Sequence, residues 1–166
     1  VVVFCTYTVP LLALRIKLEE ILGKDKVPLL SGEMTGPQRA ALLRAPSAAP
    51  GAPPAGTFHT DPTIKVLLAS FAAGGVGIQM APAATAAVML DVWWNPATMR
   101  QAEDRIHRLG TVRACDVYTI VGDGSFDTAC RDIYHKFKTN TSAIIVDRRY
   151  PPGTTSTVTI REGAEE

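Results

Sequence analysis

Two arginines three residues apart, Arg105 and Arg108, are the residues of this chain best suited to bind an anion. They fall in a segment that we expect to be helical over residues 96–109, and residues at i and i+3 lie on one face of a helix. Gln101, four residues before Arg105, belongs to the same face. A guanidinium is always charged and binds phosphate oxygens with a planar fork, so the pair suits a phosphate group whose charge grows during its transfer.

A solvated, salt-bridged helix face explains the same spacing, since Asp104 lies four residues before Arg108. The neighbouring His107 invites a catalytic interpretation, but a histidine that packs or hydrogen-bonds between helix and strand edge is the simpler one. The same alternative applies to the late basic residues, which could touch phosphates or form a solvated helix face: Arg131, Lys136, Lys138, Arg148 and Arg149.

A glycine cluster precedes the arginines. Gly74, Gly75 and Gly77 follow an apolar segment that ends at Ser70. Glycines let a backbone approach a ligand closely, and the N–H groups at a helix start attract phosphate. A tight turn needs the same residues. The segment is not a P-loop, because no Lys-Ser or Lys-Thr follows it.

Two tryptophans stand directly before an Asn-Pro pair. Asn95 is expected to cap the helix that carries the arginines, with Pro96 in its first turn. We expect Trp93 to belong to the core and Trp94 to be an exposed contact residue.

The bulk composition is that of an ordinary soluble globular fold, with 46% hydrophobic and 20% charged residues over 166 positions. The net charge of +1 gives no overall nucleic-acid signature. Three widely spaced cysteines make a disulfide framework or a metal site unexpected and fit a reducing compartment. No apolar run is long enough to span a membrane, and no basic stretch is followed by an apolar segment and a cleavage site, so we expect a protein that is not secreted.

Short apolar segments alternate with helical ones along the chain. Strands are expected over residues 1–7, 27–30, 64–70, 86–92 and 115–121, with a last one over 143–146. Helices are expected from a cap at Thr8 through Leu22, over 36–44, over 96–109 and over 125–138. On the first of them an apolar stripe is expected, formed by Leu11, Leu14, Leu18, Ile21 and Leu22. On the last, helical spacing predicts burial of Phe126, Ala129 or Cys130, Ile133, Tyr134 and Phe137. This alternation predicts an α/β fold, a parallel twisted sheet with helices on both faces.

Ligands of such sheets bind at the carboxyl ends of the strands. Three informative loops follow strands, at residues 31–35, 70–77 and 93–96, so we expect them on one edge. Residues 45–56 contain four prolines, two glycines and no charge. We therefore divide the chain into a lobe over residues 1–146 with a flexible insert at 45–57, and a polar tail over 147–166. A chain that opens directly on a buried-type strand is expected to be a segment of something longer.

Taken in order, these motifs resemble the second RecA-like lobe of the SNF2 family of DNA-translocating ATPases. The most specific stretches are residues 73–78, the Trp-Trp-Asn-Pro junction at 93–96, and residues 101–110. The Gly-Gly-Val-Gly wording at residues 74–77 and the Trp-Trp-Asn-Pro-Ala wording at 93–97 are similar to the branch of DNA-repair and fork-remodelling translocases that is often fused to a ubiquitin-ligase RING.

The resemblance implies roles for the matching positions. Arg105 and Arg108 would be arginine fingers that reach the γ-phosphate of ATP held, with Mg²⁺, mainly by an absent first lobe. Gln101, Gly75 and Gly77 would lie near the nucleotide. The residues implied to contact the DNA backbone are Gly32, Met34, Thr35, Arg39, Ser70, Gly74 and Trp94.

The chain departs from the family pattern at several positions. Phe71 and Ala72 stand where the family has Thr and then Lys or Arg, which removes a hydroxyl and a charge expected at the DNA backbone. Ser31, Gln79 and Thr111 also replace the usual Asp, Asn and Gln.

The resemblance implies the C-terminal lobe of an ATP-dependent translocase on double-stranded DNA, paired with a first lobe of the same parent chain and inactive as an ATPase by itself. The implied location is the nucleus or a viral or intracellular DNA-replication compartment, not a membrane or the outside of the cell. Two alternatives remain: a lobe kept as a non-catalytic DNA- or protein-binding module, and a helicase lobe that acts on RNA.

Overall fold

Short, mostly apolar segments form the strands of a parallel sheet. The computed structural model describes residues 1–47, 49–73, 78, 80–81, 83–107 and 114–145, with the backbone alone over 140–145. Its strands are β1 (Val2–Cys5), β2 (Leu29–Leu30), β3 (Leu67–Ser70), β4 (Ala86–Met89) and β5 (Asp116–Thr119). Within this part of the chain they form one five-stranded sheet in the order β2-β3-β1-β4-β5, with every neighbouring pair parallel.

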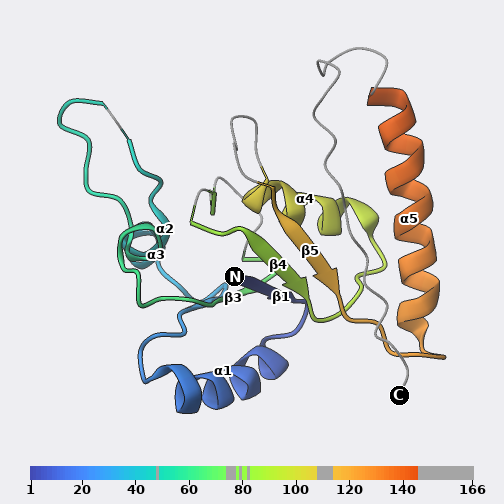
Figure 1. The fold of residues 1–166 in the computed structure, drawn as a ribbon, viewed down its shortest axis with the longest axis horizontal. Helices are drawn as coiled ribbons and strands as arrows, with labels where there is room; N and C mark the ends of the chain where they lie inside the picture. Colours follow the sequence, from blue (N-terminus) through green and yellow to red (C-terminus); the bar gives the residue numbers. More distant parts are fainter. Residues whose placement is uncertain (48, 74–77, 79, 82, 108–113, 146–166) are drawn as a thin grey trace.

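Four helices lie in the connections between strands, as the crossovers of a parallel sheet do: α1 (Thr8–Leu22), α2 (Gly36–Leu43), α3 (Thr57–Thr60) and α4 (Pro96–Ile106). A further helix, α5 (Phe126–Ile145), follows the last strand. In Figure 1, α1 lies below the sheet and α4 above it, while α2 and α3 lie together at the left. None of the described helices is both long and apolar enough to cross a lipid bilayer.

The central strand β1 is buried on both of its faces. Val2 and Phe4 point into the larger core cluster, which also contains the buried side chains of α2, α4 and α5. Val3 and Cys5 point into a smaller cluster that includes Leu11 of α1. Alternate residues of a strand face opposite sides of the sheet, so these two clusters are its two covered faces. The predicted fold class, a parallel sheet flanked on both faces, is confirmed.

The predicted apolar stripe of α1 is only partly buried. Leu11 is fully buried, but Ile21 is 77% exposed. A helix of 15 residues is about 22 Å long, whereas strands of 4 residues extend only about 13 Å, so the last turn of α1 overhangs the sheet. The expected cap at Thr8 is also wrong: Thr8 is the first helical residue, and Tyr7 occupies the cap position without a side-chain hydrogen bond.

The C-terminal helix is longer than expected. The apolar residues 143–145, predicted as the start of a last strand, belong to α5. So short an apolar run does not distinguish a strand from the end of a helix by its periodicity. Of the side chains expected to be buried on this helix, Cys130 and Tyr134 are buried, but Phe126 and Ile133 are exposed.

The segment predicted as an insert leaves α2 and returns to α3 at one point. The amide of Gly56 donates to the carbonyl of Arg44 at 2.8 Å, and Arg44 Nη1 donates to the carbonyl of Pro54 at 3.4 Å. Gly56 lies so close to the Leu42 carbonyl that a Cβ at this position would overlap it. The base of the segment is therefore packed directly on α2.

Candidate functional site

The loops singled out in the sequence follow β2, β3 and β4. Because these strands are parallel, their carboxyl ends meet at one edge of the sheet, as expected. A contact that the sequence did not suggest ties this edge together: the amide of Thr6, after β1, donates to both carboxylate oxygens of Asp91, after β4, at 3.0 Å. The one signal in the sequence that could have indicated this contact is an acidic residue, Asp91, just after the end of a buried strand.

The residues after β2 build the start of α2. Thr35 caps this helix, with its hydroxyl accepting from the Gln38 amide at 3.5 Å and its own amide donating to Gln38 Oε1 at 2.9 Å. Arg39 is half-buried, and its Nη2 donates to the Ser31 carbonyl at 3.5 Å. Gly32 is exposed, and Met34 packs partly against the larger core cluster. Thr35 and Arg39 thus both hold this loop in shape.

Ser70 ends β3 and is buried, with 6% of its surface exposed. Its hydroxyl oxygen accepts from the Ala73 amide at 3.2 Å, which closes the turn after the strand. The next residue, Phe71, stacks on Phe4 with ring centroids 5.8 Å apart. Phe71, one of the departures from the family pattern, is therefore a core residue, and Ala72 beside it is exposed.

The two tryptophans divide as expected. Trp93 packs partly against the larger core cluster, whereas Trp94 is 59% exposed at the carboxyl edge. The helix behind them begins where predicted, because Asn95 Oδ1 accepts from the Ala97 amide at 3.0 Å and Pro96 occupies the first turn. This start fixes the direction in which α4 carries Gln101 and Arg105.

The helix α4 ends three residues earlier than expected. Ile106 is its last residue, and His107 has extended backbone angles, φ −114° and ψ 105°. The carbonyl of Arg105 is already used, because it accepts from the amides of Met80 at 3.0 Å and Ala81 at 3.3 Å. In a continuing helix it would accept from the amide four residues later. His107, expected to pack, is exposed.

This early end removes the helical basis for pairing Arg105 with Arg108. Arg108 lies outside the described residues, as do Gly74, Gly75 and Gly77. Gln101 and Arg105, four residues apart on α4, remain on one helix face. Gln101 is exposed and Arg105 is half-buried.

The guanidinium of Arg105 contacts the segment after β3, with Nη1 donating to the Ile78 carbonyl at 3.4 Å. This contact does not lie at the carboxyl edge. Cys115 Sγ, directly before β5, donates to the carbonyl of Ile106 at 3.4 Å, so the end of α4 lies near the amino end of β5. Trp94 and Arg105 thus mark opposite ends of α4, about 16 Å of helix apart.

The site residues therefore fall into two regions. The carboxyl edge holds Gly32, Met34, Thr35, Ser70 and Trp94, with Arg39 just behind in α2. The arginine region holds Gln101 and Arg105 with residues 78–81. Among the residues that the structure describes, no group of three or more His, Cys, Asp or Glu side chains could hold a metal ion.

Comparison with known families gives one match over most of the chain. Residues 1–110 match the family described as "Helicase conserved C-terminal domain". Residues 111–166, which include β5 and α5, lie beyond that match.

Three curated relatives illustrate the similarity. The "Helicase-like transcription factor CHR28" of Arabidopsis thaliana is 46% identical over 63 residues, which cover 38% of this chain and 6% of that protein. The "ATP-dependent helicase rhp16" of Schizosaccharomyces pombe is 35% identical over 107 residues, 64% of this chain and 11% of that protein. The "DNA repair protein RAD5A" of Arabidopsis thaliana is 36% identical over 91 residues, 55% of this chain and 9% of that protein. The matched part is thus a small fraction of each relative.

A solved structure shares the fold. The C-terminal part of the Fun30 ATPase domain superimposes with a TM-score of 0.66 at 25% sequence identity, covering 80% of this chain and 38% of that chain.

Proposed function

This chain belongs to the helicase conserved C-terminal domain family and resembles SNF2-family members in particular, and from that premise we propose that it supplies an arginine to ATP held by another lobe of the same parent protein. In this proposal the parent is an ATP-dependent translocase on double-stranded DNA. Hydrolysis opens and closes the two lobes, and this lobe steps along the DNA backbone with its carboxyl edge.

The proposal is supported mainly by the contacts that fix Arg105 in place. Its backbone carbonyl accepts from the amides of Met80 and Ala81, and its guanidinium donates to the carbonyl of Ile78, so both parts of the arginine are held by residues that follow the glycine segment in sequence. A guanidinium fixed in this way suits the charge that develops on a transferred phosphoryl group. Gln101 supports it on the same helix face, and Arg108, Gly75 and Gly77 complete the nucleotide side of the proposal.

Magnesium belongs to the other lobe in this proposal. The first lobe binds Mg²⁺ with the ATP phosphates, because metal ions in such enzymes bridge the oxygens of the phosphates on which they act. The chain by itself is then inactive as an ATPase, and the lobe over residues 1–146 works only beside its partner lobe.

The carboxyl edge is the proposed DNA side. Among its described contact candidates, Trp94, Gly32 and Thr35 are exposed. Met34, Arg39, Ser70 and Gly74 complete the proposed surface. The separation of this edge from Arg105 by the length of α4 allows DNA and nucleotide to bind at the same time. Action on DNA implies a nuclear location, or a compartment where viral or other intracellular DNA replicates.

Turnover by the full-length parent tests this proposal. ATP hydrolysis is measured with no nucleic acid, with duplex DNA and with RNA, beside the 166-residue chain alone. We expect duplex DNA to stimulate the parent and the isolated chain to show no turnover. Turnover by the isolated chain that is lost on Arg105→Ala would contradict the division into two lobes, and stimulation by RNA alone would contradict the DNA assignment.

A second candidate function, a non-catalytic DNA- or protein-binding module, is favoured by one observation. Phe71 is packed in the core at a position where the family has a hydroxyl for the DNA backbone. A parent that binds duplex DNA but shows no turnover under any of these conditions would support the module instead of the motor.

A further inference from the structure

The last turn of α4 is held from two sides. Glu103 and Arg105 are two residues apart, which places them about 200° apart around the helix axis. Arg105 contacts the segment at residues 78–81 on one side. Glu103, on the other side, contacts α5. The orientation of this turn therefore depends on both contacts.

Glu103 makes a compact, charged contact with two side chains of α5. Its carboxylate accepts from the Tyr134 hydroxyl at 2.5 Å and from Lys138 Nζ at 2.9 and 3.2 Å. The Lys138 ammonium also lies 5.7 Å from the centroid of the Tyr134 ring. The Glu103 side chain is only 15% exposed and Tyr134 is 7% exposed. Hydrogen bonds to a charged group are stronger in a partly buried position of this kind than at a fully exposed surface.

Tyr134 keeps its proton in this contact. Burial raises the pKa of its phenol, and the negative charge of Glu103 raises it further. A protonated phenol donates to the carboxylate, so the hydrogen bond persists throughout the neutral range. Lys138 supplies the positive charge that balances the buried carboxylate.

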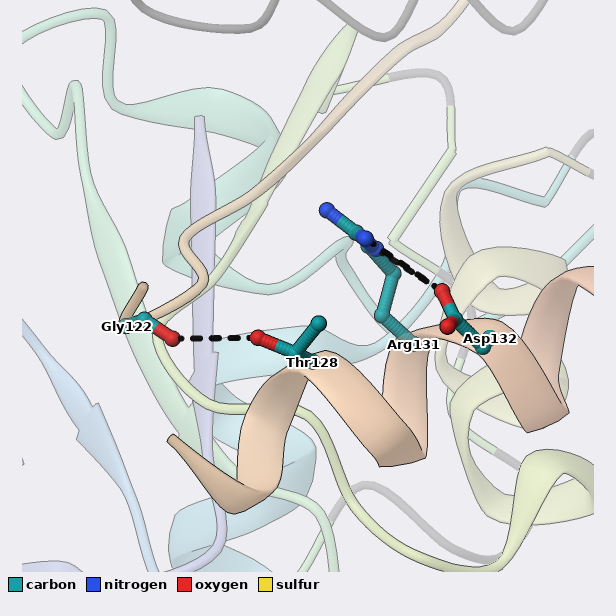
Figure 2. A network of polar contacts seen from close by, with 4 residues as sticks. All are labelled: Gly122, Thr128, Arg131 and Asp132. Atoms are coloured by element: carbon teal, nitrogen blue, oxygen red, sulfur yellow. Dashed lines mark hydrogen bonds and ion pairs between the residues drawn. The ribbon is translucent and has the colours of Figure 1, made fainter. Parts of the chain in front are cut away.

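The helix that carries Tyr134 and Lys138 is itself anchored at its start. Ser125 Oγ and Thr128 Oγ1 both donate to the carbonyl of Gly122, at 2.6 and 3.4 Å. Figure 2 shows the second of these bonds beside the ion pair between Arg131 and Asp132 on the same helix. All of α5 lies beyond the residues that match the helicase domain family.

We propose that Glu103 is a positioning residue, through which Tyr134 and Lys138 of α5 hold the last turn of α4 in the orientation that places Arg105 against residues 78–81. This inference rests on the proposed function for its consequence in catalysis, because Arg105 is the arginine assigned to ATP. The contact itself can be tested in the 166-residue chain without nucleotide. In functional terms, α5 determines the orientation in which Arg105 is presented to ATP.

Hydrogen exchange at the Met80 and Ala81 amides measures the proposed effect, since these amides are the donors to the Arg105 carbonyl. Lys138→Met removes the charge and keeps most of the stem. We expect it to speed exchange at both amides about tenfold, because a lost hydrogen bond to a charged group makes local opening that much more frequent. Lys138→Arg keeps the charge and should restore slow exchange. Glu103→Gln should behave like Lys138→Met.

The amides of Phe71 and Leu90, which donate to Cys5 and Phe4 in the centre of the fold, report global stability in the same experiment. Two results would overturn the proposal: unchanged exchange at Met80 and Ala81 in Lys138→Met, or faster exchange at Phe71 and Leu90 to the same degree. The proposed function is contradicted by a different result, namely ATP turnover that is undiminished in the full-length parent carrying Arg105→Ala. That outcome would leave the exchange result intact.

Discussion

The backbone carbonyl of Arg105 accepts a hydrogen bond from the amide of Met80 at 3.0 Å, although the two residues belong to different segments of the chain. The bond ends α4 and joins the arginine to the segment that follows the glycine cluster. A backbone contact of this kind persists when the side chain is changed. The stability of the lobe and the chemistry of the arginine can therefore be separated by mutation.

Replacing the Arg105 side chain should leave the fold intact. Arg105→Ala removes the bond from Nη1 to the Ile78 carbonyl but keeps the carbonyl that holds Met80 and Ala81. We expect the free energy of unfolding to fall by about 1.5–3 kcal/mol, the net value of a hydrogen bond that involves a charged group. Urea denaturation of the 166-residue chain measures it. A loss above about 3 kcal/mol would show that the side chain is a major structural element.

Adding one methyl group at the base of the Pro/Ala/Gly-rich segment should destabilise the lobe. In Gly56→Ala the new Cβ would overlap the Leu42 carbonyl of α2, which is backbone and cannot rotate away. We expect a loss of about 1–3 kcal/mol in thermal or urea unfolding. Gly32→Ala is the matched control, because a Cβ at Gly32 meets nothing within 4 Å. Equal stability of the two variants would contradict the packing described for Gly56.

Thr35 should matter for stability even without DNA. Thr35→Ala removes the hydroxyl of a capping box and should cost about 1 kcal/mol, while Thr35→Ser keeps the oxygen and should cost much less. Denaturation of both variants in the absence of nucleic acid provides the measurement. If Thr35→Ala were as stable as the parent sequence and only DNA binding changed, the hydroxyl would have no structural role.

Most elements and their order could be predicted from the sequence because they rest on local patterns, but the short helix α3 was not expected, and residues 143–145 were predicted as a strand and are helical. The β-branched and apolar segments became strands, and Asn95 with Pro96 marked the start of α4 where the structure has it. The end of α4 could not be predicted in the same way. It is fixed by amides of Met80 and Ala81, a contact between distant segments that leaves no pattern around Arg105.

The candidate site could be predicted only where it depends on local patterns, and not where it depends on contacts between distant segments. Exposure of Trp94 and partial burial of Trp93 followed from their place at a strand-to-helix junction. The clamp formed by Glu103, Tyr134 and Lys138 was missed, because helical spacing marked Tyr134 only as a core residue. Trp94 and Arg105 are separated because α4 runs from the carboxyl edge of the sheet toward its amino edge. The order of the motifs along the sequence does not indicate this direction, so the separation could not be predicted.

The phenol of Tyr134 should resist ionisation while the chain is folded. Its pKa is raised above the unfolded value of about 10, so the stability it contributes is fully present below that pH and is lost only as the pH rises through the folded value. Absorbance at about 295 nm during alkaline titration, compared between the native sequence and Tyr134→Phe, follows this group. The two curves should coincide until the protein unfolds. A difference centred near pH 10 in folded protein would show that the phenol is not buried against Glu103.

The assignment of Arg105 to ATP is best tested by the DNA-stimulated ATP turnover of the full-length parent carrying Arg105→Ala. Arg100→Ala, on the same helix but a different face, serves as the control. We expect kcat of Arg105→Ala to fall about 10³-fold, the usual effect of losing an arginine that stabilises phosphoryl transfer, with KM for ATP little changed and the control close to the native parent. Turnover of Arg105→Ala equal to that of the control would contradict the assignment of Arg105 to ATP.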